Sequence, residues 1–415
     1  MINLLFLKKN RNLMRFWVAQ VFSQFGDRIH QLALIGLITT RVPGSTVAMT
    51  TLISFCIIPA FLFQPVAGVI VDRVDRRKLM ILCDFARAML VLMIPAFMKA
   101  PGLLPIYLVV FCIYSFTRFY VPAKLALVPQ IVEHEQVLEA NSLLSTTGMI
   151  AAGLGGALGA VFVEFYGSQV GFILDAVTYA TSGLLLLAMI NKAPGMTGKP
   201  QGQKPPLNVK NILADIKEGA QYIRTHQDLR QVVNVVVTLL ACVGAVYVVL
   251  IVFIQQVFQS VTIDLGFLVV SFAVGLFLGV LLYSKWGKHI KAFQAIFFCL
   301  MLGGLMLVIF TLVIQLYASR PLAMGLAFFW GVTIAPIFIA INTIVHKFSD
   351  ETMHGKTFSA LEIIIHATFL LAMFITAGLS KILSEYLILL TVGVIITLVG
   401  ALGLLKGKKA SDLAI

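Results

Sequence analysis

The stretch GVIVDRVDRR at 68–77 decides the fold of this chain. It places five charged residues between two apolar runs, at 46–71 and 79–97. Each run is long enough to cross the hydrocarbon core of a bilayer, which needs about 20 residues of helix. The connection between the runs is too short to hold a domain. The sequence therefore predicts a tight hairpin of two membrane helices, with a charged elbow at the membrane surface.

The composition of the whole chain also indicates a membrane protein. Hydrophobic residues make up 60% of the 415 residues and charged residues only 12%, whereas soluble domains have about 25% charged residues. The mean hydropathy is +0.98. A soluble protein of this composition would lack the polar surface that keeps it dispersed, so the soluble class is excluded.

Further apolar runs extend this pattern along the chain. Together they give twelve candidate spans, at 13–40, 46–71, 78–98, 103–122, 138–163, 169–191, 229–256, 264–284, 289–317, 322–346, 357–380 and 384–405. Each span should be a helix, because lipid offers no partner to a backbone N–H or C=O group. We predict an all-α membrane protein with twelve transmembrane helices.

The basic residues predict the orientation of these spans. Nearly all of them fall on one side of the membrane, and the exceptions are Arg41, Lys99, Arg320 and Lys381. Since positive charge favours the cytoplasmic side, both termini should be cytoplasmic. The net charge of +13 is therefore interpreted as a topology signal, and we expect no nucleic-acid partner.

A polar stretch marks the middle of the chain. Residues 191–210 are rich in Pro, Gly and Lys, which predicts a flexible cytoplasmic linker. Apolar residues at helical spacing in 211–228 then predict an amphipathic helix on the inner leaflet. We expect a six-helix bundle at 1–190, the linker with its helix at 191–228, and a second six-helix bundle at 229–415, related as parallel repeats.

The elbow resembles the signature loop of the major facilitator superfamily of secondary transporters. That loop lies between helices 2 and 3 and has the pattern G-x-x-x-D-R/K-x-G-R/K-R/K. The residues that meet it here are Gly68, Asp72, Arg73, Arg76 and Arg77. Asp75 stands where the family usually has its second glycine. The resemblance covers the whole chain and implies two pseudo-symmetric six-helix bundles that transport a solute.

Shorter motifs resemble two branches of that superfamily. The motifs DRVDRRK at 72–78, LEANSL at 138–143 and GKTFS at 355–359 are similar to the macrolide-efflux and enterobactin-exporter-like branch. The motifs FGD at 25–27 and PAK at 122–124 are similar to bacterial lysophospholipid transporters. The first resemblance implies export of a small molecule, and the second implies lipid movement.

The elbow also has a physical interpretation. Asp72 lies at the C-terminal end of its helix, where a negative charge opposes the helix dipole unless a cation pairs with it. The signature residues, Gly68, Asp72, Arg73, Arg76 and Arg77, are therefore a candidate cytoplasmic gate. For Asp72 and Arg73 we favour the gate, because an anchor needs no acid. For Arg76 and Arg77 a positive-inside anchor is the stronger interpretation.

The first span carries the strongest candidate for a binding site. Gln20, Gln24, Asp27 and Gln31 lie on one helical face, with Ser23 and His30 beside it. An ionised Asp27 near mid-span costs ~3 kcal/mol, so it should face a cavity or a partner. Its role is open among a protonatable coupling group, a counter-charge for a cationic substrate, and a structural partner of Arg28 or a distant arginine.

Other polar residues of the spans are weaker candidates. Asp84 and Arg87 can form a local pair, for which a structural role is the stronger interpretation. Asp175 shares a helical face with Tyr179, near the outer end of its span where water could reach it. The complete set of candidate substrate- or proton-binding residues is Asp27, Gln24, Arg28, His30, Gln31, Arg118 and Glu362.

Three further observations concern the polar residues and the glycines of the spans. Arg118 is close enough to the surface for its side chain to snorkel. Glu362 and His366 share a helical face, as a proton relay or as a packed pair. Five glycines of the fifth span, Gly148, Gly153, Gly155, Gly156 and Gly159, predict close helix packing.

No catalytic motif is present, neither GxSxG, nor a P-loop, nor HExxH, nor CxxC, so we expect no enzyme, no cofactor and no metal. The predicted function is secondary transport across a bacterial cytoplasmic membrane by a monomer. An amphiphilic or hydrophobic small molecule would be exported by alternating access in exchange for protons. The alternative is a lysophospholipid flippase of the same membrane.

Overall fold

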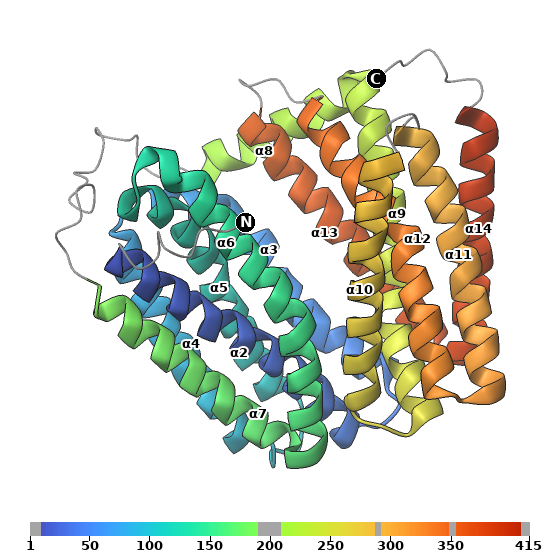
Figure 1. Ribbon diagram of the computed structural model, residues 1–415, viewed down its shortest axis with the longest axis horizontal. Helices are drawn as coiled ribbons and strands as arrows, with labels where there is room; N and C mark the ends of the chain where they lie inside the picture. Colours follow the sequence, from blue (N-terminus) through green and yellow to red (C-terminus); the bar gives the residue numbers. More distant parts are fainter. Residues whose placement is uncertain (1–9, 190–208, 287–291, 348–353, 408–415) are drawn as a thin grey trace. The chain divides into compact units, whose positions relative to one another are not determined.

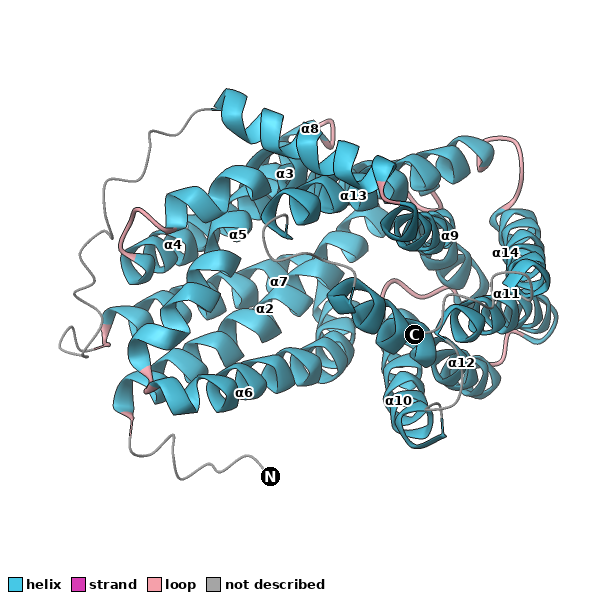
Figure 2. Cartoon of the chain, turned by 90° about the horizontal axis from the view of Figure 1, so that it is seen from above, coloured by secondary structure: helices cyan, strands magenta, loops and turns pink. Residues whose placement is uncertain are grey.

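The computed structural model describes residues 10–189, 209–286, 292–347 and 354–407. These residues form helices joined by loops, and no strand occurs among them (Figure 2). Most of the predicted linker at 191–210 and both chain ends lie outside the described residues. The predicted cytoplasmic location of the termini is therefore still a prediction.

Helices of membrane length fill the first part of the chain (Figure 1). They are α2 (Arg11–Arg41), α3 (Thr46–Val71), α4 (Arg76–Phe97) and α5 (Leu104–Ile131). A short 3-10 turn, η1 (His134–Gln136), then leads into α6 (Val137–Ile150), a π-helical turn η2 (Ala151–Gly155) and α7 (Gly156–Leu187).

The second part begins with α8 (Val209–Thr225), which covers the predicted amphipathic segment. The helices that follow it are α9 (Gln227–Phe258), α10 (Ile263–Trp286), α11 (Ala292–Tyr317), α12 (Arg320–Lys347), α13 (His354–Leu379) and α14 (Glu385–Gly407). Each of the twelve predicted spans coincides with helix, and α3 has the predicted bounds.

By length and composition, 10 helical stretches of the described chain could cross a membrane. Two features explain why this number is below twelve. The polar middle of α2 keeps that helix out of the count, and the run His134–Leu187 is counted once although two predicted spans lie within it. With α2 added and the long run divided, the helical stretches of the described chain correspond to the twelve predicted spans.

Gly167 divides that run. Its backbone has φ 80° and ψ 164° inside α7, a conformation that side chains with a Cβ atom essentially never adopt. The chain can therefore turn here between the predicted spans at 138–163 and 169–191. The sequence marked this place only as a gap between two apolar runs.

The described chain separates into two compact units. Unit 1 comprises Met1–Arg41 and Thr51–Ile212, and unit 2 comprises Val42–Thr50 and Leu213–Ile415. The same pairing of helices occurs in each unit: α4 packs on α7 in unit 1, as α11 packs on α14 in unit 2 (Figure 1). Both are the third span of the unit paired with the sixth, as parallel repeats would have it.

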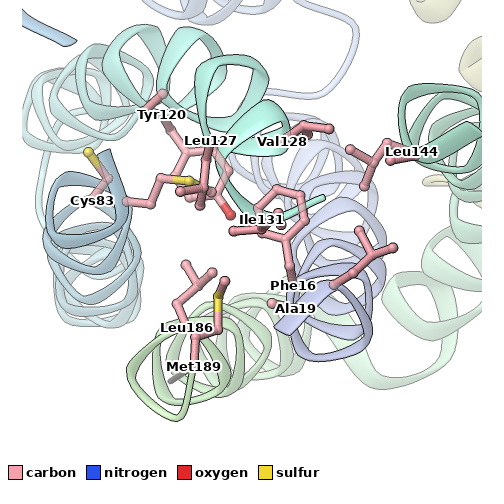
Figure 3. Packing of buried hydrophobic residues seen from close by; sticks show 14 of the residues in the cluster. Phe16, Ala19, Cys83, Tyr120, Leu127, Val128, Ile131, Leu144, Leu186 and Met189 are labelled. Carbon is pink, nitrogen blue, oxygen red and sulfur yellow. The ribbon is translucent and has the colours of Figure 1, made fainter. Parts of the chain in front are cut away.

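The apolar core of unit 1 gathers residues from α2, α4, α5, α6 and the end of α7. Figure 3 shows Phe16, Tyr120, Ile131, Leu144 and Leu186 converging from these helices. Between membrane helices such contacts are stabilised by close van der Waals packing, because lipid tails are as apolar as these side chains. The core fixes the register of the helices, and with it the placement of the polar residues beside it.

The predicted surface helix α8 is attached to unit 2. Its Ile223, 5% exposed, packs in a cluster with Val233 of α9 and with Ala360 and Leu361 of α13. At least this part of its apolar face is buried against protein. The sequence thus predicted an amphipathic helix, but only the tertiary structure shows that this part of its apolar face packs on α9 and α13.

Two of the four basic residues predicted on the less basic side have structural partners. In unit 1, Arg41 donates to the carbonyl of Met98 and, at 2.7 Å, to that of Ala100, which satisfies backbone groups beyond the end of α4. In unit 2, Arg320 pairs with Asp264 at 2.8 Å. These arginines stabilise helix ends and therefore do not weaken the predicted charge bias.

Candidate functional site

A buried ion pair lies at the centre of unit 1. Arg87 Nη2 donates to Asp84 Oδ1 at 2.5 Å, across three residues of α4, and the two side chains are 1% and 0% exposed. Ser182 on α7 donates to the other Asp84 oxygen at 2.8 Å. Charged groups away from water are tolerated only when they are paired and hydrogen-bonded, and both conditions are met here.

Two tyrosine rings enclose the guanidinium of Arg87. Its Cζ atom lies 4.3 Å from the ring centroid of Tyr120 on α5 and 4.2 Å from that of Tyr179 on α7. The negative faces of these rings attract the cation, and the attraction is larger for a desolvated cation. Gln20 on α2 donates to the hydroxyl of Tyr120 at 2.7 Å. Arg87 is thus fixed by contacts from three helices.

Asp27 joins this group from α2. The hydroxyl of Tyr179 donates to Asp27 Oδ1 at 2.5 Å, and Nη1 of Arg87 lies 3.9 Å from the same oxygen. The Asp27 side chain is 40% exposed, in contrast to the buried Asp84. We call Asp27, Asp84, Arg87, Tyr120 and Tyr179 the Arg87 cluster. Asp27 is its accessible carboxylate.

A second link joins α2 and α7 one helical turn away. His30 Nδ1 lies 3.0 Å from Asp175 Oδ2, and these side chains are 2% and 0% exposed. The His30 ring contacts Phe172 edge-on at 5.7 Å and lies 6.4 Å from the ring of Tyr114 on α5. The expectation that water reaches Asp175 was wrong, because the close contact of α2 with α7 covers this carboxylate.

Acidic groups outnumber basic groups in this region. Asp27, Asp84 and Asp175 are its carboxylates, and Arg87 is the buried cation. Lys124, one turn beyond Tyr120 on α5, also interacts electrostatically with Asp27 and Arg87. Three ionised carboxylates with two cations leave one negative charge, which a protonated His30 or a bound cation would neutralise.

Glycines allow the helices of unit 1 to approach closely. A Cβ atom on Gly26 of α2 would lie 1.9 Å from Thr178 Oγ1 and 2.6 Å from Asp175 Oδ1. The predicted glycines Gly148, Gly155 and Gly159 also face α2, against Gln24, Phe25 and Ile29. For Gly153 and Gly156, in contrast, a Cβ atom would meet open space. Close packing is therefore confirmed for three of the five glycines.

The comparisons with known proteins identify the fold and the family. Residues 16–368 match the family described as Major Facilitator Superfamily. The chain belongs to the Major Facilitator Superfamily. The superfamily consists of membrane transporters, so this chain is a multi-pass transporter of that family and its fold is the major facilitator fold.

Curated relatives in the superfamily include exporters. The chain is 28% identical to the uncharacterized transporter YkuC of Bacillus subtilis over 84% of its own length and 80% of the relative. It is 24% identical to the putative bacilysin exporter BacE of B. subtilis, with 72% of each chain covered. It is 26% identical to macrolide efflux protein A of Streptococcus pyogenes, with 71% of each covered.

Solved structures agree on the fold. A bacterial homologue of the iron transporter ferroportin has a TM-score of 0.71 and 13% identity, with 95% of this chain and 98% of that one covered. The nucleoside transporter NupG has a TM-score of 0.69 and 11% identity over the same shares. At such identities the likeness shows the fold alone.

The structure separates the predicted face of α2 into two parts. Gln20, Asp27 and His30 contact α5 and α7. Gln24 is directed at Gly148 of α6, whereas Arg28 packs on Gly155 and donates to Gln31 at 3.4 Å. A bulge in the helix opposite this second part, η2, spans Ala151–Gly155. One part of the predicted face therefore packs on α5 and α7, and the other part packs on α6 and η2.

Two other predicted site residues have different neighbours. Arg118 on α5 interacts electrostatically with Cys56 of α3. Glu362 lies on α13 in unit 2, where its carboxylate is 3.4 Å from His366 Nδ1. The side chains of His366 and Glu362 are 26% and 45% exposed, so this pair is much less buried than the His30–Asp175 pair.

In the signature elbow of the superfamily, each charged residue has its own environment. Asp72 lies 3.7 Å from Arg76, and Asp75 accepts from the N–H of Lys78 at 3.0 Å as the N-cap of α4. Arg77 donates to the carbonyls of Leu186 and Leu187 at the end of α7, both at 2.7 Å. Arg77 therefore stabilises a helix end, a more specific role than the predicted anchor.

The remaining signature residues are less informative. Arg73 follows α3 directly, and its backbone N–H donates to the carbonyl of Ile70 at 2.9 Å. A Cβ atom on Gly68 would meet nothing within 4 Å among the described residues. Packing within the described structure thus gives no reason for a glycine at this position.

The sequence alone does not show which residues surround Asp27. Spacing predicts Asp84 and Arg87 as a local pair and Asp175 and Tyr179 as neighbours on one face, but it connects neither pair with α2. The available signal was spacing: Asp84 and Arg87 are three apart, Asp175 and Tyr179 four apart, and Asp27 and His30 three apart. Such spacings place side chains on one face but do not say which faces meet.

Proposed function

We propose that this transporter exports an amphiphilic small molecule with a cationic group in exchange for protons, and that Asp27 binds the cation. The observation that carries the proposal is the environment of Asp27: an accessible carboxylate that faces a buried guanidinium and a tyrosine hydroxyl. A carboxylate in a membrane helix is expensive and, in general, indicates a pathway for substrate or protons.

Two further observations support this assignment. The three carboxylates Asp27, Asp84 and Asp175 outnumber the two cations Arg87 and Lys124, so a bound cation would balance the charge of the region. An oxygen of Asp27 is also 3.9 Å from the Arg87 guanidinium, whereas an oxygen of Asp84 is 2.5 Å from the same guanidinium. Because Asp84 is the close partner of Arg87, Asp27 can exchange partners at a smaller cost.

Export is the proposed direction because the relatives named for a substrate are described as an efflux protein and a putative exporter. Apolar spans and the phenylalanines and tyrosines of unit 1 suit an amphiphilic compound better than a sugar, which needs more buried hydrogen-bonding groups. The proposed location is a bacterial cytoplasmic membrane, with both termini inside. The elbow residues Asp72 and Arg73 would form part of a cytoplasmic gate.

The lysophospholipid alternative has less support. A lipid head group would need Arg28, Arg87 or Arg118 to face it, yet Arg87 is 1% exposed and paired with Asp84. Lipid movement is nevertheless included as an outcome of the experiment below.

The test is transport in proteoliposomes, with and without an imposed pH gradient, for wild type, Asp27→Asn and Asp27→Glu. The probes are a macrolide, the lipophilic cation tetraphenylphosphonium and a fluorescent lysophospholipid. A hydrogen bond to a charged group contributes about 1.5–3 kcal/mol, so Asp27→Asn should lower transport of a macrolide with an ammonium group roughly 10- to 100-fold. Tetraphenylphosphonium has no hydrogen-bond donor, so its transport should fall by less. Asp27→Glu should retain part of the transport.

The matched control is Glu133→Gln, an exposed acid before η1, which should transport like wild type. Gradient-driven movement of the macrolide or the cation that requires Asp27 is the expected result. Movement of the lysophospholipid alone, indifferent to the gradient and to Asp27, would overturn the proposal in favour of the flippase.

A further inference from the structure

The two contacts between α2 and α7 differ in their access to water. Asp27 meets Tyr179, and His30 meets Asp175, so the residue numbers rise on one helix as they fall on the other. Asp27 is 40% exposed, whereas His30 and Asp175 are 2% and 0% exposed. The first contact is thus partly exposed, and the second is buried.

The closed pair has unused capacity for a proton. In the described part of the chain, three buried atoms of this pair lack a hydrogen bond of good geometry: both ring nitrogens of His30 and Oδ2 of Asp175. Nδ1 and Oδ2 are nevertheless only 3.0 Å apart. Buried polar atoms are nearly always satisfied, and exceptions indicate a missing ligand or a functional role. A proton is the ligand that fits between two such atoms.

Charge balance indicates how many protons the pair holds. A neutral imidazole beside an ionised Asp175 would leave a net negative charge in an apolar site, which is costly. With one added proton the pair is an imidazolium and a carboxylate, or a neutral imidazole and a carboxylic acid. Either form has no net charge, so the closed site favours the proton-bound pair.

The other charged groups near this pair also indicate that it holds one added proton. They are Asp27 on α2, Asp84 and Arg87 on α4 and Lys124 on α5, with the ionisable hydroxyls of Tyr114, Tyr120 and Tyr179. Three ionised carboxylates, two cations and one proton on the His30–Asp175 pair sum to zero. A further cation at Asp27 brings a positive charge, and loss of that one proton would restore neutrality.

We propose that His30 and Asp175 form a second proton-binding site, and that this site, one turn from Asp27, releases the proton exchanged for the cationic substrate. When the cation binds Asp27, the proton on the pair passes to water, which leaves a neutral His30 and an ionised Asp175. When the cation leaves, the pair takes up a proton again. This inference rests on the proposed function for the substrate, but the proton site itself can be tested without one.

The first experiment follows His30 alone, in the full-length protein with ¹⁵N-labelled histidine in detergent micelles. Exposed His134 provides the reference signal, which His134→Gln assigns. The His30 signal, assigned with His30→Gln, should be that of a hydrogen-bonded or protonated ring. In Asp175→Asn it should become that of a neutral ring.

A wedge variant covers the case in which removal of the pair prevents folding. Gly26→Ala keeps both groups but places a methyl group against Thr178 and Asp175, so α2 and α7 must separate there. The His30 signal should then become that of a ring that has lost its contact with Asp175. A wild-type His30 that is neutral throughout and insensitive to Asp175→Asn would overturn the inference, whatever the transporter carries.

The second experiment measures proton release with a pH indicator in weakly buffered solution. Addition of tetraphenylphosphonium to the wild-type protein should release about one proton for each cation bound. His30→Gln and Asp175→Asn should still bind the cation through Asp27 but release no proton, and in proteoliposomes they should lose gradient-driven accumulation. Unchanged proton release in both variants would overturn the inference and leave Asp27 as the proton carrier.

The two experiments separate the two proposals. If no cation or macrolide binds, the proposed function fails, while the histidine titration still decides the proton site. If the cation binds and requires Asp27 but His30 behaves as an ordinary buried neutral ring, the proposed function stands and the second site is rejected.

Discussion

Asp84 and Arg87 meet at 2.5 Å with almost no exposure, on the same helix and three residues apart. The pair was expected from its spacing, but its position at the centre of four helices was not. Tyr120, Tyr179 and Ser182 come from two other helices and complete the environment of the pair. The stability of unit 1 and the orientation of Arg87 toward Asp27 therefore depend on the same contact.

Removal of either partner should destabilise the protein. Asp84→Asn leaves a buried guanidinium without its close counter-charge, and Arg87→Met leaves a buried carboxylate, so each should cost about 3–5 kcal/mol. The measurement is thermal unfolding in detergent. The double variant Asp84→Asn/Arg87→Met removes both charges and should be more stable than either single variant. If the single variants unfold like wild type, the pair is not the structural centre of unit 1.

The two acids of the elbow should have separable effects. Asp75 caps α4 through the N–H of Lys78, so Asp75→Ala should lower stability by about 1 kcal/mol, as loss of an N-cap does. Asp72 is 46% exposed and lies 3.7 Å from Arg76, so Asp72→Asn should change stability by less than about 0.5 kcal/mol. If Asp72 belongs to a gate, its variant should lower the transport rate while Asp75→Ala mainly lowers stability. The reverse pattern would remove Asp72 from the gate.

Arg76 and Arg77 allow a matched comparison. Arg77 caps the end of a helix, whereas Arg76 forms a surface ion pair with Asp72. Arg77 donates to the carbonyls of Leu186 and Leu187, and hydrogen bonds from a charged group contribute about 1.5–3 kcal/mol. Solvent screening reduces the contribution of these hydrogen bonds, because Arg77 is only partly buried. Arg77→Gln should therefore reduce the free energy of unfolding by about 1 kcal/mol or more, and Arg76→Gln by about 0.3–0.5 kcal/mol. Chemical unfolding followed by tryptophan fluorescence would rank the two variants, and equal stabilities would contradict the capping role.

Gly167 should be far more sensitive to substitution than a glycine in the same helix with ordinary backbone angles. Its φ of 80° and ψ of 164° are open only to glycine, so Gly167→Ala should cost about 1–3 kcal/mol. Gly156 has φ −63° and ψ −46° and open space around it, so Gly156→Ala should be neutral or stabilise the helix by up to about 1 kcal/mol. Thermal unfolding of the two variants checks this, and an equal effect would mean that the chain does not need its turn at Gly167.

The sequence alone determined the class of the protein, its spans and its family resemblance. Apolar length suffices to predict each span, because a bilayer admits only segments that satisfy their own backbone groups. This is why α3 and α14 began within one residue of their predicted starts. The elbow at 68–77 carried the family, since its charges and spacing stand out against an apolar background. Individual polar residues such as Asp27 were also visible, because acids are rare in such segments.

Only the tertiary structure decided which of these polar residues meet. Helical spacing gives the face on which a residue lies, but the neighbour of that face depends on packing between helices far apart in the sequence. Asp27 and Tyr179 are 152 residues apart, and nothing local to either predicts their contact. The glycines on α2, α6 and α7 set how closely the helices approach, and this approach buried Asp175, which the sequence had placed in reach of water. Burial and partnership are properties of the packed bundle, and they decide which carboxylate is partly exposed and which one is buried against a histidine.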